Sequence, residues 1–331
     1  MAGAGRGIVF LQKKTYRGGA GHSQAPGRVG ECSAMRKRFP LERSPLFTAI
    51  FCDASAAALC QQARAANWAG ADGVCVELRN LPRDERTPEK LRSLMDASPL
   101  PTMCCLYRSD LVCGADDDAR TKTLLSALDA GAACIDVMGD LFDPSPREWS
   151  RGKAAIAKQK RLIAKIHDAG AQAIMSSHPL CFLPPEEVLA QLKDFERRGP
   201  DLVKLVQKAD TEEEFLAALR ATMLCRRELK TPFVHLVSGA FGNLHRMIAP
   251  SLGVALTFAT LDQRGAYPMP QPPLANFRGV HEFLRFRLPE RPAPQAPVAG
   301  TAGGRARAGS ARRATRAAGG ASSPAKGRSG A

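Results

Sequence analysis

The sequence has no long apolar run, no paired cysteine motif and almost no acidic residues near its ends. No stretch approaches the roughly 20 consecutive apolar residues of a membrane helix, and the N-terminus lacks the apolar core of a secretory signal. The ten cysteines include no Cys-x-x-Cys pair and no Cys/His grouping at zinc spacing. We therefore expect no membrane partner and no metal, with buried reduced thiols in a reducing, cytoplasmic compartment.

The net charge of +15 is confined to the two ends of the chain. Residues 1–44 carry nine Lys/Arg against two acids, and residues 291–331 carry eight Lys/Arg and no acid. Residues 45–290 are consequently neutral overall, which argues against a polyanion-binding surface on the globular part. If the chain contacts nucleic acid, we expect the contact to be weak and nonspecific and to be made by the tails.

The two basic ends have the composition of disordered segments. Residues 291–331 consist mainly of Ala, Gly, Pro, Ser and Arg, and their apolar side chains are no larger than Val298. Such a segment has too little apolar surface to bury, so folding could not offset its loss of conformational entropy. Residues 1–44 are similarly rich in Gly and Arg, and Met35 precedes the first strand-like run, so translation starting at Met35 and an organelle-import peptide both fit.

Residues 45–290 repeat one pattern, in which a short apolar run is followed by a longer amphipathic stretch. The eight runs that we interpret as strands are 46–52, 73–79, 101–108, 133–139, 171–178, 202–207, 233–239 and 255–261. Four helix-like stretches end in glycines at C-cap positions, namely Gly70, Gly131, Gly170 and Gly199. Eight βα units over about 245 residues predict one domain with the (β/α)8 TIM-barrel fold, and an open doubly wound sheet is the alternative.

Charged residues near strand ends are the candidate site, because a barrel of this type builds its active site at the carboxyl ends of its strands. These residues are Glu77, Arg79, Arg108, Asp136, His178, Lys204 and Arg246. Lys204 interrupts the apolar run LVKLV, and desolvation beside cations would favour a neutral, nucleophilic amine. A lysine that reaches solvent or pairs with Asp201 explains the position equally well. His178 ends the neighbouring predicted strand, as either a proton shuttle or a structural histidine.

Several motifs together resemble the type I 3-dehydroquinate dehydratases over residues 46–287. They are VELR (76–79), LYR (106–108), IDV (135–137), the block from Ser176 to Val206, GNLHR (242–246), and TFATL (257–261) followed by Pro270 and Gln271. The block that contains His178 and Lys204 is the most specific part. The resemblance implies a lyase of the shikimate pathway that removes water from 3-dehydroquinate to give 3-dehydroshikimate without a metal or organic cofactor.

The resemblance also assigns roles to the two central residues. Lys204 would form a Schiff base with the C3 ketone, and the iminium would stabilise the carbanion at C2. His178 would take the C2 proton and then protonate the departing C1 hydroxyl. Arg246 and Gln271 correspond to positions that hold the substrate carboxylate.

The remaining positions are assigned by the same comparison. Glu77, Arg79 and Arg108 correspond to the polar cluster that orders the ring hydroxyls and the imine. Asp136 corresponds to an acid near the catalytic pair, and Tyr267 stands in the substrate-covering loop, at a position usually held by serine. Both a monomer and a homodimer fit the sequence.

The chain departs from the family at several supporting positions. Leu81, Val112 and Met138 stand where relatives commonly carry acidic residues, and the Val112 position usually provides a Glu near the catalytic histidine. Asp110 or one of Asp116, Asp117 and Asp118 is the predicted substitute. These changes keep two alternatives open, a Schiff-base aldolase on the same fold and a non-catalytic domain that senses a related metabolite.

Overall fold

The computed structural model describes residues 36–261 and 271–284, all within the compact unit Met1–Leu288. This part of the chain alternates strands with helices. The strands are β1 (Leu46–Phe51), β2 (Gly73–Glu77), β3 (Thr102–Cys105), β4 (Cys134–Met138), β5 (Gln172–Ser177), β6 (Leu202–Lys208), β7 (Phe233–Ser238) and β8 (Leu256–Ala259). The α-helices are α1 (Ala56–Trp68), α2 (Pro88–Asp96), α3 (Asp117–Asp129), α4 (Lys153–Asp168), α5 (Pro185–Glu196), α6 (Glu212–Glu228), α7 (Gly242–Ile248) and α8 (Leu274–Leu284).

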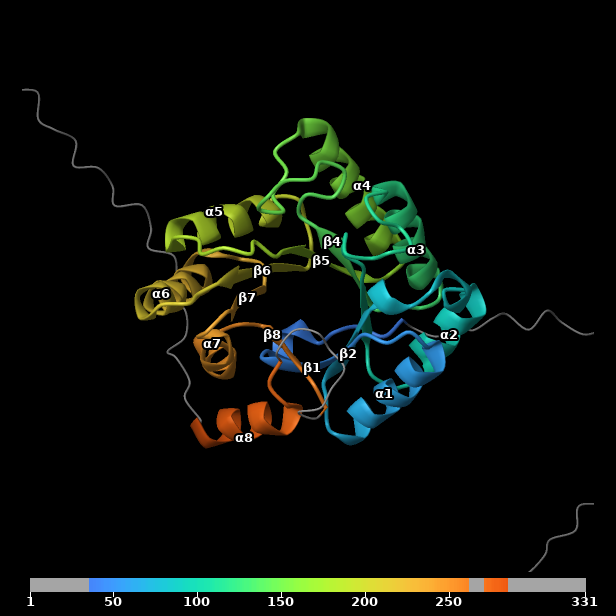
Figure 1. Cartoon of the computed structure of the whole chain (residues 1–331), viewed down its shortest axis with the longest axis horizontal. Coiled ribbons are helices and arrows are strands. Elements are labelled where there is room, and N and C mark those ends of the chain that lie inside the picture. The colour runs from blue at the N-terminus through green and yellow to red at the C-terminus, as the bar shows by residue number, and fades with distance from the viewer. Residues whose placement is uncertain (1–35, 262–270, 285–331) are drawn as a thin grey trace, which may run out of the picture. The chain divides into compact units, whose positions relative to one another are not determined.

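The eight strands form a parallel barrel surrounded by the helices (Figure 1). From β1 to β7 each strand pairs with the next along the chain, and β8 pairs with β1. The last gap is bridged at Ala255, whose N–H donates to Phe233 at 2.8 Å while its carbonyl accepts from Leu46 at 2.9 Å. The (β/α)8 fold predicted from the eight apolar runs is therefore confirmed, and the open sheet is not observed.

The predicted helix ends are confirmed as well. All four glycines placed at helix ends have positive φ, between 76° and 113° (Gly70, Gly131, Gly170 and Gly199). This left-handed conformation lets the chain leave the helix and enter the next strand at low steric cost. In the described residues, seven cysteines are buried, as their apolar surroundings predict (Cys52, Cys60, Cys75, Cys104, Cys105, Cys134 and Cys225).

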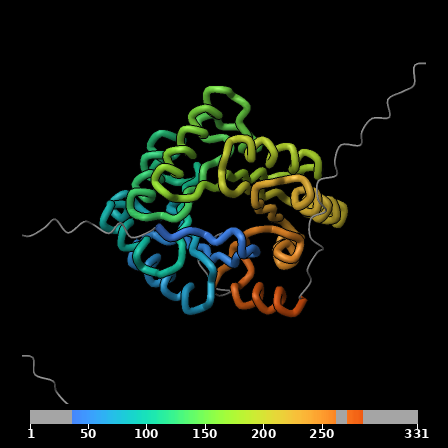
Figure 2. The backbone as a smooth tube through the Cα atoms, turned by 180° about the vertical axis from the view of Figure 1, so that it is seen from behind, coloured from blue at the N-terminus to red at the C-terminus, as the bar shows by residue number. Residues whose placement is uncertain are grey.

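Residues 36–44, which we call the N-terminal strap, cross the end of the barrel opposite the carboxyl ends of the strands (Figure 2). Phe39 is 3% exposed, and a Cβ on Gly73 would lie 2.2 Å from its ring, so only glycine fits there. The Gln172 side chain accepts from the Phe39 N–H at 2.7 Å and donates to its carbonyl at 3.1 Å.

Basic side chains hold the N-terminal strap in place. Arg36 donates to the carbonyls of Leu128 and Ala132, and Lys37 donates to those of Met95 and Ser98. These carbonyls lie at or just beyond the C-terminal ends of α3 and α2, where cations are favourable. The predicted disordered extension of residues 1–44 is thus wrong for residues 36–44, because their basic charge caps helices and Phe39 fills the barrel end.

Among the described helices, none is long and apolar enough to cross a membrane.

Candidate active site

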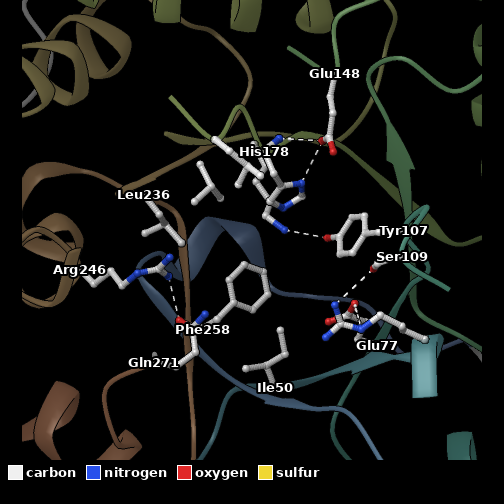
Figure 3. A pocket seen from close by; sticks show the side chains of 14 residues that line it. Ile50, Glu77, Tyr107, Ser109, Glu148, His178, Leu236, Arg246, Phe258 and Gln271 are labelled. Atoms are coloured by element: carbon white, nitrogen blue, oxygen red, sulfur yellow. Dashed lines mark hydrogen bonds and ion pairs between the residues drawn. The ribbon is translucent and has the colours of Figure 1, made fainter. Parts of the chain in front are cut away.

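A cavity of about 280 Å³ opens at the carboxyl ends of the strands (Figure 3). Six of the predicted site residues line it, namely Glu77, Arg79, His178, Lys204, Arg246 and Gln271. Its other lining residues are Ile50, Tyr107, Ser109, Glu148, Leu180, Val206, Leu236 and Phe258. All eight strands or the segments that follow them therefore bring these side chains to one place. Tyr267 lies outside the described residues.

Lys204 projects from β6 into the cavity and is 5% exposed. Its Nζ donates to the Tyr107 hydroxyl at 3.0 Å and lies 3.7 Å from Asp136 Oδ2. The face of the Phe258 ring covers the amine from another side, 4.8 Å from the ring centroid. Its side chain thus lies in the cavity, and no ion pair with Asp201 forms, since Asp201 instead contacts His167 and Arg38.

Asp136 is buried in β4 beside Lys204 and does not line the cavity. The Tyr107 hydroxyl donates to its Oδ2 at 2.7 Å, and the Ser176 hydroxyl donates to its Oδ1 at 2.5 Å. Both carboxylate oxygens consequently have a donor, which offsets the cost of burying the charge. Asp136 contacts the lysine mainly through Tyr107.

Glu148 binds His178 in the cavity wall (Figure 3). One carboxylate oxygen of Glu148 accepts from the His178 backbone N–H at 2.7 Å and lies 3.1 Å from the ring Nδ1. Burial raises the pKa of Glu148, but hydrogen bonds and the charge interaction with His178 outweigh this and lower the pKa below its usual value. An ionised carboxylate can only accept, so Nδ1 carries the proton and Nε2 is the basic nitrogen.

The loop between β4 and α4 presents Glu148 in an uncommon backbone conformation, with φ of 47°. Arg198, at the end of α5, is buried and donates to the carbonyls of Gly139 and Ser150, both at 2.8 Å. A side chain on Gly139 would overlap the Phe195 ring and the Glu148 carbonyl. A buried arginine and a required glycine thus fix the loop that carries the carboxylate.

The predicted substitutes for this carboxylate are wrong, because each acid serves a local structure. Asp110 pairs with Arg86, Asp116 caps the N-terminus of α3, and Asp117 pairs with Arg108. Asp118 follows in the first turn of α3, where an acid suits the helix dipole. Glu148 lies ten residues beyond the end of β4, so a search of strand ends does not find it.

Arg108 follows β3 but does not line the cavity, contrary to the prediction from the sequence. It donates to Asp140 Oδ1 at 2.7 Å, to the Asp140 carbonyl at 2.9 Å and to Asp117 Oδ2 at 2.8 Å. Burial would lower the pKa of Arg108, but the hydrogen bonds and charges of these two carboxylates raise it. The ion pairs hold this arginine outside the cavity, and its neighbours Tyr107 and Ser109 line the wall instead.

Arg246 and Gln271 meet on the opposite side of the cavity. Arg246 is 3% exposed, its Nε donates to the Val237 carbonyl at 2.9 Å, and its Nη1 donates to Gln271 Oε1 at 2.8 Å. Because the amide oxygen accepts from arginine, the amide NH₂ is the group that remains to donate to a ligand. Guanidinium and amide donors together suit a carboxylate.

The third side of the cavity holds an acidic and a basic side chain, Glu77 at the end of β2 and Arg79 just after it. Glu77 Oε1 lies 3.3 Å from Arg79 Nε, and Arg79 Nη1 donates to the Ser109 hydroxyl at 3.2 Å. Glu77 is 2% exposed, so its charge is compensated inside the protein. Carboxylate, guanidinium and hydroxyl groups here can bind the hydroxyls of a polyol ring.

Behind Arg246, two histidines are buried in a chain of hydrogen bonds. His235 Nδ1 lies 2.8 Å from the Thr222 hydroxyl, which lies 3.0 Å from His245 Nε2. Burial lowers the pKa of His235 to about 3. Burial, His235 and Arg246 together also lower the pKa of His245. Both rings are therefore neutral near pH 7 and support the wall of the cavity without charge.

Leu81, Val112 and Met138, three positions at which the sequence departs from the family pattern, do not line the cavity. Leu81 and Met138 are buried in the hydrophobic core, and Val112 is half-buried in the turn after β3.

In the described residues, no three His, Cys, Asp or Glu side chains are grouped so that they could hold a metal ion.

The fold and the cavity define a class, a (β/α)8-barrel protein in which an amine and a carboxylate-bound imidazole face the mouth of the barrel. The chain belongs to the type I 3-dehydroquinase family, whose profile matches residues 54–287. Two curated relatives are 3-dehydroquinate dehydratases. That of Aromatoleum aromaticum is 26% identical over 161 residues, 48% of this chain and 57% of the relative. That of Shouchella clausii is 31% identical over 129 residues, 39% and 50% of the two chains.

Solved structures show the same fold. The 3-dehydroquinate dehydratase of Geobacillus kaustophilus superposes with a TM-score of 0.63 at 19% identity, covering 73% of this chain and 92% of that one. That of Aquifex aeolicus gives 0.55 at 18% identity, covering 73% and 100%. The chain spans about half the length of the curated relatives that it matches in sequence.

Proposed function

We propose that this protein is a 3-dehydroquinate dehydratase, a hydro-lyase that forms 3-dehydroshikimate through a Schiff base on Lys204. One observation carries the proposal. The Lys204 amine, the His178 ring and the Arg246–Gln271 pair all face one cavity of about 280 Å³. A small keto acid needs an amine for the ketone, a base for the adjacent proton and a cation for the carboxylate.

Binding begins at the carboxylate of the substrate. Arg246 and the Gln271 amide hold this group, and Glu77, Arg79 and Ser109 bind the ring hydroxyls. Since both Arg246 and Glu77 are almost completely buried, these contacts form with little competition from water. The ketone is then directed toward Lys204.

The reaction follows from the two central groups. The neutral Lys204 amine adds to the C3 ketone, and loss of water gives an iminium that acidifies the C2 proton. His178 Nε2 takes this proton, because Glu148 holds the proton of Nδ1 on the other side of the ring. The resulting enamine expels the C1 hydroxyl, which His178 protonates as it leaves. Water then hydrolyses the imine and frees Lys204.

The proposed pathway is the shikimate route to aromatic amino acids, and the proposed compartment is the cytoplasm. The cysteines support the second point, because buried unpaired thiols suit a reducing compartment.

The test is turnover of 3-dehydroquinate by the full chain, followed as the absorbance of the conjugated enone in 3-dehydroshikimate. We expect turnover by the wild type and none by Lys204→Ala, with circular dichroism showing that the variant is folded. A wild type that does not turn over 3-dehydroquinate would contradict the proposal.

A further inference from the structure

Tyr107 stands between the amine and the buried acid of the site. Its hydroxyl accepts from Lys204 Nζ at 3.0 Å and donates to Asp136 Oδ2 at 2.7 Å. Tyr107 follows β3, Asp136 lies in β4 and Lys204 lies in β6, so the barrel brings together three separate strands or strand ends.

The distances decide by which route a proton can move. Lys204 Nζ and Asp136 Oδ2 are 3.7 Å apart, which is too long for a hydrogen bond. Both links through the tyrosine oxygen are of hydrogen-bond length. Ser176 donates to the other carboxylate oxygen and thereby leaves Oδ2 to Tyr107. The hydroxyl is thus the short connection between amine and acid.

We propose that Tyr107 relays protons between Lys204 and Asp136 while the Schiff base forms and is hydrolysed. This inference rests on the proposed function in one respect, since it takes Lys204 as the amine that attacks the ketone. Lys204 gives a proton to the tyrosine oxygen as the tyrosine gives its own proton to Asp136. The amine becomes neutral, the carboxylate becomes a carboxylic acid, and Tyr107 is unchanged.

The neutral amine adds to the ketone, and one of its N–H protons shifts to the former ketone oxygen to give the carbinolamine, which then loses water with the help of the same relay. Asp136 returns its proton to the tyrosine oxygen, and the tyrosine proton passes to the carbinolamine hydroxyl. The carbon–oxygen bond then breaks, water leaves, and the nitrogen lone pair forms the iminium double bond. Asp136 is 2% exposed and does not line the cavity, so the tyrosine hydroxyl connects this acid to the groups that react in the cavity.

A packing role for Tyr107 is the competing explanation. The rings of Tyr107 and His178 pack edge to face, with 4.6 Å between the ring centroids. Tyr107→Phe keeps this contact and removes only the hydroxyl. Loss of a relay and loss of packing are therefore separable by one substitution.

The experiment measures imine formation at Lys204 with a ketone that is not the substrate. The full chain and Tyr107→Phe are incubated with acetone and excess cyanoborohydride, and isopropylation of Lys204 is timed by peptide mass spectrometry. Exposed Lys153 on α4 provides an internal reference, and Trp68→Phe, exposed on α1, is the control variant. The reactions are repeated over a range of imidazole concentrations at fixed pH.

We expect Lys204 alkylation in Tyr107→Phe to slow on the order of 100-fold and to accelerate with imidazole, because an external acid–base pair replaces the relay. Wild type and Trp68→Phe should not depend on imidazole. Alkylation of Tyr107→Phe at the wild-type rate would overturn the relay, and so would slow alkylation that imidazole does not accelerate. A wild type that shows the expected relay behaviour but forms no 3-dehydroshikimate would contradict only the proposed function.

Discussion

The two ends of the barrel differ in the kind of side chain that lines them. At the mouth, the buried side chains of Glu77, Asp136, Lys204 and Arg246 are held by ion pairs and hydrogen bonds around a cavity. At the other end, Phe39 of the N-terminal strap packs against the starts of the strands. This contrast indicates that the closed end contributes stability and the open end contributes chemistry, as the barrel architecture allows. The predictions below test that division, beginning with the largest expected effect.

Phe39→Ala should cost stability and leave chemistry intact. Removing a buried phenylalanine is expected to lower the free energy of unfolding by about 4 kcal/mol, measured by urea denaturation. The turnover number per folded molecule should be unchanged. Phe283→Ala, at a position 86% exposed on α8, is the control and should change stability by less than about 0.5 kcal/mol. A large fall in turnover for Phe39→Ala would contradict the claim that the closed end of the barrel contributes stability and not chemistry.

Two arginines at the mouth sharpen the same comparison. Arg108→Ala leaves Asp140 buried without its cation and should cost about 3 kcal/mol of stability. Its kcat/KM should stay within about threefold of wild type, since Arg108 does not line the cavity.

Arg246→Ala should instead lower kcat/KM about 100-fold, because a charge-assisted contact to the carboxylate is lost. Steady-state kinetics and denaturation of both variants provide the measurements. Equal kinetic losses in Arg108→Ala and Arg246→Ala would contradict the orientation of Arg108.

Glu148→Gln tests the carboxylate that orients His178. The neutral amide can still accept from the ring but no longer stabilises a protonated imidazole, so kcat should fall on the order of tenfold. Steady-state kinetics with 3-dehydroquinate provide the measurement. Asp110→Asn serves as a comparison, with a stability loss and an unchanged kcat. An unaltered kcat in Glu148→Gln would refute the assignment.

The last prediction concerns pH and the buried histidine pair. In the folded protein the pKa of His235 is about 3, well below that of an exposed histidine, so the unfolded chain binds more protons between these values. Stability should therefore fall as pH decreases below about 6.5, by up to about 1.4 kcal/mol per pH unit for this histidine. Denaturation at several pH values should show a smaller slope for His235→Gln than for wild type. Equal slopes in wild type and His235→Gln would contradict this origin.

The features that could be predicted from the sequence are those that depend on a local pattern of residues. Apolar runs located all eight strands, and the interruption at Lys204 identified a side chain that the structure places in the cavity. What it missed depends on groups distant in the chain. Arg108 is held by Asp140, 32 residues away, and Glu148 reaches His178, 30 residues away, from a loop fixed by Arg198. A rule based on the spacing of residues at strand ends cannot predict these long-range interactions.

The N-terminal strap was missed for a different reason. Its basic residues resemble those of the preceding segment in composition, and composition alone does not show that Arg36 and Lys37 meet helix carbonyls. Phe39 is the informative residue, because a large apolar side chain is unusual in a disordered segment.

The central claim is that Lys204 forms the covalent bond with substrate, and mass spectrometry tests it most directly. The full chain is incubated with 3-dehydroquinate and borohydride, digested, and mapped for the added mass. We predict that one reduced adduct is found on the peptide that contains Lys204 and that turnover is lost in proportion. Rapid turnover with no adduct on Lys204, or an adduct on another lysine, would contradict it.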